Sequence, residues 1–81
     1  MTHSEQVKAV MRTASEVGGT VREDYSGRHM YGSMCYGVVC DNVNECIEMA
    51  ATHGLRGARI DSMGMRSIIY WPDIEGQYAD D

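Results

Sequence analysis

Cysteine and histidine side chains can hold zinc or act as a nucleophile and its base, so the first residues to consider are Cys35, Cys40, Cys46 and His53. Cys35 and Cys40 fall on one predicted strand at an odd separation, so their side chains should face opposite ways. Only Cys40, Cys46 and His53 are then able to converge, and their spacing matches no zinc pattern. A nucleophilic thiol also needs electropositive, partly exposed surroundings, whereas these cysteines lie on predicted core elements. We therefore predict reduced, buried thiols, with no metal, no cofactor, no catalytic residue and no enzymatic activity.

A second candidate for chemistry is the segment Gly27–Ser33, which is close to the phosphate-binding pattern Gly-x4-Gly-Lys-Ser/Thr. The lysine is absent, and a predicted strand follows where the pattern requires a helix, so we exclude nucleotide hydrolysis. The segment is either a wide hairpin loop with glycines at its bends or a recognition loop, since arginine and aromatic side chains are typical of binding surfaces. A second loop, with Met63 and Gly64, lies in the sequence shortly before two aromatic residues. Residues of these kinds are enriched in interface cores, and the partner-binding residues that we predict are Arg28, His29, Met30, Tyr31, Met63, Arg66 and Trp71.

Composition narrows the class of partner. The chain has 7 Lys and Arg against 12 Asp and Glu, a net charge of −5, and its arginines are spread singly. Non-specific binding to nucleic acid needs clustered cations, so we expect no direct contact with DNA or RNA. No apolar run approaches the length of a membrane span, and the N-terminus has no apolar signal region, so we expect a cytoplasmic protein that binds no membrane.

Hydrophobic periodicity predicts two helices and four strands. The first helix, Ser4–Val17, would start at a Ser4 cap, and the second would follow a cap at Asp41 or Asn42. The first strand carries several charges and would be an edge strand, whereas the next has two apolar faces and would be central, with something packed closely at Gly37. The remaining predicted elements are strands 20–25, 34–40, 57–63 and 65–71 and helix 43–53.

These elements predict an α+β fold, a two-layer sandwich in the order helix-strand-strand-helix-strand-strand, with a four-stranded sheet and both helices on one face. We expect the second helix to cross over between neighbouring parallel strands. The other face of the sheet, with Arg59 and Asp61, would be the more exposed. Residues 1–81 form a single small domain, in which 73–81 would be a flexible acidic tail.

Three segments of the chain form a recognisable pattern: Tyr25–Gly32, Asp61–Gly64 and Ile69–Pro72. In these segments the chain resembles small phage and mobile-element proteins of mostly unassigned function. In its size, its acidity and its lack of catalytic groups the chain also resembles phage-encoded anti-defence proteins, anti-CRISPR proteins among them. That resemblance implies a protein that acts by occluding a site on a host complex.

Two functions follow as hypotheses. The first is an anti-defence inhibitor in the cytoplasm of a host bacterial cell, a monomer or homodimer that binds a host protein complex such as a CRISPR surveillance complex. Its acidic residues would face basic nucleic-acid-binding surfaces. The alternative is a small module that sequesters a nucleotide without catalysis, using Arg28, Tyr31 and Arg66.

Overall fold

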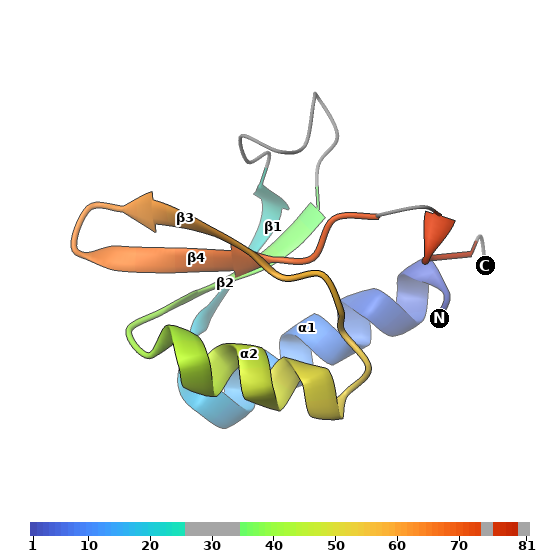
Figure 1. Ribbon diagram of the computed structural model, residues 1–81, viewed down its shortest axis with the longest axis horizontal. Helices are drawn as coiled ribbons and strands as arrows, with labels where there is room; N and C mark the ends of the chain where they lie inside the picture. Colours follow the sequence, from blue (N-terminus) through green and yellow to red (C-terminus); the bar gives the residue numbers. More distant parts are fainter. Residues whose placement is uncertain (26–34, 74–75, 80–81) are drawn as a thin grey trace.

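A computed structural model describes residues 1–25, 35–73 and 76–79, which form a four-stranded sheet with two helices on one of its faces (Figure 1). The predicted α+β order and the two-layer arrangement are confirmed. In chain order the elements are α1 (His3–Val17), β1 (Thr20–Tyr25), β2 (Cys35–Cys40), α2 (Val43–Thr52), β3 (Arg59–Met63) and β4 (Arg66–Tyr70).

The sheet has the strand order β1-β2-β4-β3, and all neighbouring strands are antiparallel. β2 and β3 therefore run parallel to each other, as a helical crossover requires, but β4 lies between them. The expectation that α2 joins neighbouring parallel strands is wrong, because the short β3–β4 hairpin returns β4 into the gap. The prediction that β1 is an edge strand is confirmed.

Side-chain caps set the start of each helix. α1 begins one residue earlier than predicted, because Thr2 rather than Ser4 is the cap: its Oγ1 accepts a hydrogen bond from the Glu5 amide at 3.1 Å. The Glu5 carboxylate in turn accepts from the Thr2 amide at 2.8 Å, which completes a capping box. α2 begins after Asn42, one of the two predicted caps, whose Oδ1 accepts from the Glu45 amide at 3.1 Å.

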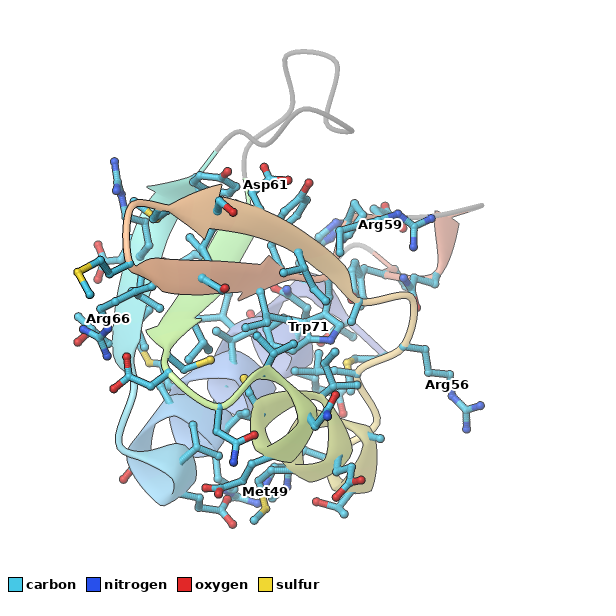
Figure 2. All side chains as sticks on the ribbon, turned by 60° about the vertical axis from the view of Figure 1, so that its left-hand side comes forward. Met49, Arg56, Arg59, Asp61, Arg66 and Trp71 are labelled. Carbon is cyan, nitrogen blue, oxygen red and sulfur yellow. The ribbon has the colours of Figure 1, made fainter. Side chains whose placement is uncertain are left out.

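The main core lies between the sheet and the helices. Side chains from α1, α2, β2 and β4 meet there, and Val10, Val38, Cys46 and Ile69 are fully buried. Trp71, the residue after β4, also lies in this layer, and Figure 2 shows it between the sheet and α2. Because Trp71 follows Ile69 by two positions, both side chains lie on the same side of the chain, toward the helices.

The face opposite the helices is also partly buried. Ile68 and Tyr70 alternate with Ile69 along β4, and all three are fully buried, as is typical of a strand covered on both sides. Ile68 lies over Gly37: a Cβ added there would come within 2.9 Å of Ile68 Cδ1, so the predicted close approach at this glycine is confirmed. Asp61 is only 8% exposed, which corrects the expectation that it lies on an open surface.

The described end of the chain is packed onto the fold. Tyr78 is 6% exposed, and its hydroxyl donates to the Trp71 carbonyl at 3.2 Å. Ala79 pairs with Thr2, donating to the Met1 carbonyl at 2.9 Å and accepting from the His3 amide at 3.0 Å. The expectation of a flexible tail is therefore wrong for residues 76–79, because a buried ring and backbone hydrogen bonds fix them to the N-terminus.

Candidate functional site

The most strongly organised polar group is a cluster of Tyr25, Asp61 and Tyr70. The Asp61 carboxylate accepts hydrogen bonds from both phenols, from Tyr25 through Oδ2 and from Tyr70 through Oδ1 at 3.3 Å. The two rings also pack against each other, with centroids 5.1 Å apart and planes inclined by 57°. The two hydroxyl donors hold this buried carboxyl group in one position, since leaving a buried polar group without its hydrogen bonds is costly.

An irregularity in β1 places Tyr25 in this cluster. The ladder pairs Arg22 with Gly37 and then Tyr25 with Cys35, so β1 contains one residue more than β2 over this interval. Without that extra residue Asp24, not Tyr25, would lie opposite Cys35. Because neighbouring residues of a strand face opposite sides, Tyr25 would then lie on the other face of the sheet. The bulge therefore turns Tyr25 toward the face of Asp61 and Tyr70.

Four of the predicted partner-binding residues, Arg28, His29, Met30 and Tyr31, lie outside the described residues. The residues that flank their segment are placed: Tyr25 and Cys35 are paired in the sheet. The role of residues 28–31 in binding stays a prediction of the sequence.

Trp71 does not serve as the exposed anchor that we predicted. Its side chain is 0% exposed and belongs to the core between the sheet and the helices. The alternation of Ile69 and Trp71 was the available signal, since it places Trp71 on the same side as the core residue of β4. The residue type of Trp71 favoured an interface, whereas its spacing of two residues from Ile69 favours a position in the core.

Met63 and Arg66 do lie together, as the last pair of the β3–β4 ladder. Arg66 is exposed, and its Nε donates to Asp41 Oδ1 at 3.0 Å. Between them, Gly64 has φ of 68°, as a two-residue hairpin turn requires, and Met65 is fully exposed. Met65 is not among the partner-binding residues predicted from the sequence, although the second position of a two-residue turn points its side chain into solvent. We name Met63, Met65 and Arg66 the hairpin tip.

The buried cysteines have the properties of inert thiols. Burial raises the pKa of Cys46 to about 12, and burial is also the main cause that raises the pKa of Cys40, whose thiol lies within hydrogen-bonding reach of Cys46. Both are protonated at neutral pH, whereas the thiolate is the nucleophile and the metal ligand. His53, the possible third partner, instead pairs with Glu16. The described residues bring together no group of three or more histidine, cysteine or acidic side chains suited to a metal ion.

A hollow of about 340 Å³ lies between α1 and the end of α2. Its polar lining includes Lys8 and Arg12 from α1 and Thr52 and His53 from the end of α2. Neither Lys8 nor Arg12 forms an ion pair with any described residue, so both cations are available to a ligand. Glu5 also lines the hollow and reduces its positive charge.

Comparison with known proteins adds no relative: no family model matches the chain, and searches of curated proteins and of solved structures find no match either. Among the described residues, no helix has the length and apolar character needed to cross a membrane.

Proposed function

We propose that this protein is a non-catalytic binding protein that uses the hairpin tip as its docking surface. The observation that carries the proposal is the position of β3. Neither helix packs against β3, and the turn of the β3–β4 hairpin projects beyond the helical layer (Figure 1). The hairpin tip therefore reaches away from the body of the molecule, where a partner can approach it from several sides.

The side chains of the tip suit contact with another protein. Methionine is flexible and adapts to irregular apolar surfaces, and arginine and methionine are both enriched in interface cores. Met65 is fully exposed and contributes no burial to this fold. Binding a partner would remove its side chain from water, which is favourable by about 1.5–3 kcal/mol for full burial.

We further propose that the partner is a host defence complex, which the chain inhibits by occlusion. The support is the resemblance to phage-encoded anti-defence proteins and the net charge of −5, which favours approach to the basic surfaces that bind nucleic acid. A CRISPR surveillance complex has such surfaces, and it is the partner that we propose.

A phage-challenge assay tests this function. Bacterial strains that carry different active CRISPR systems would express the protein and receive a phage that each system targets. We expect the wild type to restore plaques in at least one strain and Met65→Ser to restore fewer. Met11→Ser is the matched control, since Met11 is an exposed methionine on α1, 46% exposed. If no strain responds, the inhibitor function is wrong; if Met65→Ser equals the control, the docking surface is wrong.

The hollow between α1 and α2 favours the alternative function, binding of a small anion such as a nucleotide. Its volume is at the lower end of ligand sites, and Lys8 and Arg12 supply positive charge. The end of α2 opposes an anion, because the helix dipole is negative there, so this function ranks second. Arg66 is not among the lining residues, which separates the hollow from the ligand set predicted from sequence.

Thermal denaturation with a panel of nucleotides tests this alternative. A ligand present at 100 times its Kd stabilises the fold by about 2.7 kcal/mol. We expect Lys8→Ala and Arg12→Ala to abolish any such shift, whereas Arg56→Ala, which removes an exposed arginine outside the hollow, should preserve it. Unchanged melting across the panel would exclude a nucleotide-binding function.

A further inference from the structure

We infer that Met65 is a site of reversible oxidation, at which a hydroperoxide converts the thioether to a sulfoxide and thereby releases the hairpin tip from its partner. The release rests on the proposed docking function, whereas the oxidation site rests on the exposure of the side chain. Met65 is fully exposed and follows Gly64 in the turn that closes the β3–β4 ladder. A hydroperoxide therefore reaches its sulfur from solvent without any movement of the fold.

The methionines of the described residues differ in their exposure to solvent. Met65 is fully exposed, whereas Met11 and Met1 expose less than half of their surface, at 46% and 42%. Met49 and Met63 are partly buried. Because a hydroperoxide must contact the sulfur atom, the oxidation of methionine follows exposure. Met65 should therefore react first among these residues.

The step is a two-electron oxidation at sulfur. The thioether sulfur attacks one oxygen of hydrogen peroxide, the O–O bond breaks and an S–O bond forms. The sulfur gives up two electrons, and the displaced hydroxide takes the proton of the transferred hydroxyl group, so the products are methionine sulfoxide and water. The reaction needs no thiolate, and Cys40 and Cys46, which are buried and protonated, do not compete for the peroxide.

Oxidation changes the property on which docking depends. A sulfoxide is polar, so its burial against an apolar partner surface loses the gain that the thioether provides. Loss of that gain corresponds to binding that is ~10–100-fold weaker. Arg66 is held by Asp41 through a hydrogen bond of 3.0 Å, so the charged group beside Met65 has its own support. The loss of affinity therefore comes from the modified side chain.

The fold does not depend on the side chain that is modified. Met65 contributes no burial, and neither helix packs against β3. The paired residues of the ladder end at Met63 and Arg66, so Met65 lies outside them. Oxidation of a core methionine disrupts packing, whereas oxidation here leaves the folded protein in place for sulfoxide reductases to restore the thioether. The modification thus acts on binding without acting on stability.

Peptide mapping by mass spectrometry, after timed exposure of the full chain to hydrogen peroxide, tests the site. We expect Met65 to be oxidised at least about twice as fast as Met11 and Met1, in proportion to exposure. Cleavage by trypsin leaves Met63 and Met65 in the peptide 60–66, in which fragment ions locate the sulfoxide. Oxidation of Met11, Met1 or Met63 ahead of Met65 overturns the site.

The variant Met65→Leu tests the independence from stability. Leucine keeps an apolar side chain of similar size that peroxide does not oxidise, while every other methionine stays as in the wild type. After the same exposure to peroxide, the two proteins should show the same change in melting temperature. A larger fall for the wild type overturns the independence, since only oxidation of Met65 distinguishes the two samples.

The plaque assay tests the release, in a responsive strain that lacks methionine sulfoxide reductases. Plaques at sublethal peroxide are counted relative to the same protein without peroxide. We expect this ratio to fall for the wild type and for Met11→Leu, and to fall less for Met65→Leu. Equal ratios for all three overturn the release and leave the proposed function standing. If the wild type restores no plaques without peroxide, the proposed function and the release fall together, whereas mass spectrometry still decides the site.

Discussion

The hydroxyl of Tyr25 donates a hydrogen bond to the carboxylate of Asp61, and this bond joins the two opposite edges of the sheet. β1 and β3 share no backbone hydrogen bond, because β2 and β4 lie between them. The side-chain contact spans that distance on the face away from the helices, from the last residue of β1. One carboxylate therefore links the two edges of the sheet.

Loss of this bond should destabilise the protein. Tyr25→Phe keeps the ring packed on Tyr70 but leaves a buried carboxylate without one of its donors, which typically costs about 1–3 kcal/mol. For a domain of this size we expect a fall in melting temperature of about 4–8 °C for each kcal/mol. Tyr36→Phe is the control, since Tyr36 lies on the adjacent strand and takes no part in the cluster. Equal melting of the two variants would contradict a stabilising role for the bond.

Removal of Tyr78 should also destabilise the fold, in contrast to the behaviour of a flexible tail. Tyr78→Ala removes a buried ring from the core, and comparable aromatic truncations cost about 3–5 kcal/mol. Tyr78→Phe keeps the ring and loses the hydrogen bond to the Trp71 carbonyl, so it should cost about 1 kcal/mol. Urea denaturation of both variants measures the difference. If Tyr78→Ala unfolds at the wild-type urea concentration, the tail is not docked in solution.

The close contact at Gly37 predicts an overpacked variant. Gly37→Ala would place a methyl group 2.9 Å from Ile68 Cδ1 and 3.1 Å from the Ile69 carbonyl oxygen, so the core must shift, at a cost of about 1–3 kcal/mol. Shortening the neighbour in the double variant Gly37→Ala/Ile68→Val should recover part of this loss. Melting curves of both variants and of Ile68→Val alone give the coupling. Strict additivity would mean that the two side chains do not compete for space.

The buried thiols predict a loss of stability at high pH. Burial raises the pKa of Cys46 from 9.0 to about 12, so the folded protein holds this proton more tightly than the unfolded chain does. The stabilisation is fully present below pH 9 and declines between about pH 9 and 12, at up to about 1.4 kcal/mol per pH unit. Cys46→Ala should show a shallower decline in urea denaturation measured across this range. An unchanged slope would show that Cys46 does not titrate differently in the two states.

The local elements of this fold could be predicted from the sequence, because each depends on neighbouring residues. The apolar stripe of α1, the Asn42 cap and the charges of β1 act over a few positions. The remaining features depend on residues distant in the chain. The sequence allows several strand orders, and it does not show that β4 lies between β2 and β3. The bulge that turns Tyr25 toward Asp61 depends on one extra residue in the pairing of β1 with β2.

The candidate site was harder to predict than the helices and strands, because it also depends on residues that are distant in the chain. Asp61 looks like an ordinary acidic residue until two tyrosines from other strands are placed beside it. Trp71 and Tyr78 look like surface aromatics in a polar C-terminal segment until each is seen to cover the other in the core. Met63 and Arg66 are close in the sequence, and the hairpin brings them together across a two-residue turn, whereas their role in binding stays a prediction.

The pairing of Thr2 with Ala79 places the beginning and the end of the described chain side by side, on the opposite side of the molecule from the β3–β4 turn (Figure 1). A short peptide linker between these ends would close the backbone into a ring without displacing any core element. The ring could then be opened at Gly64, where a two-residue turn joins β3 and β4. Such a circular permutant keeps every strand pair and interrupts the chain only at the hairpin tip. It therefore separates the contribution of the continuous turn to partner binding from the contribution of the sheet that supports the turn.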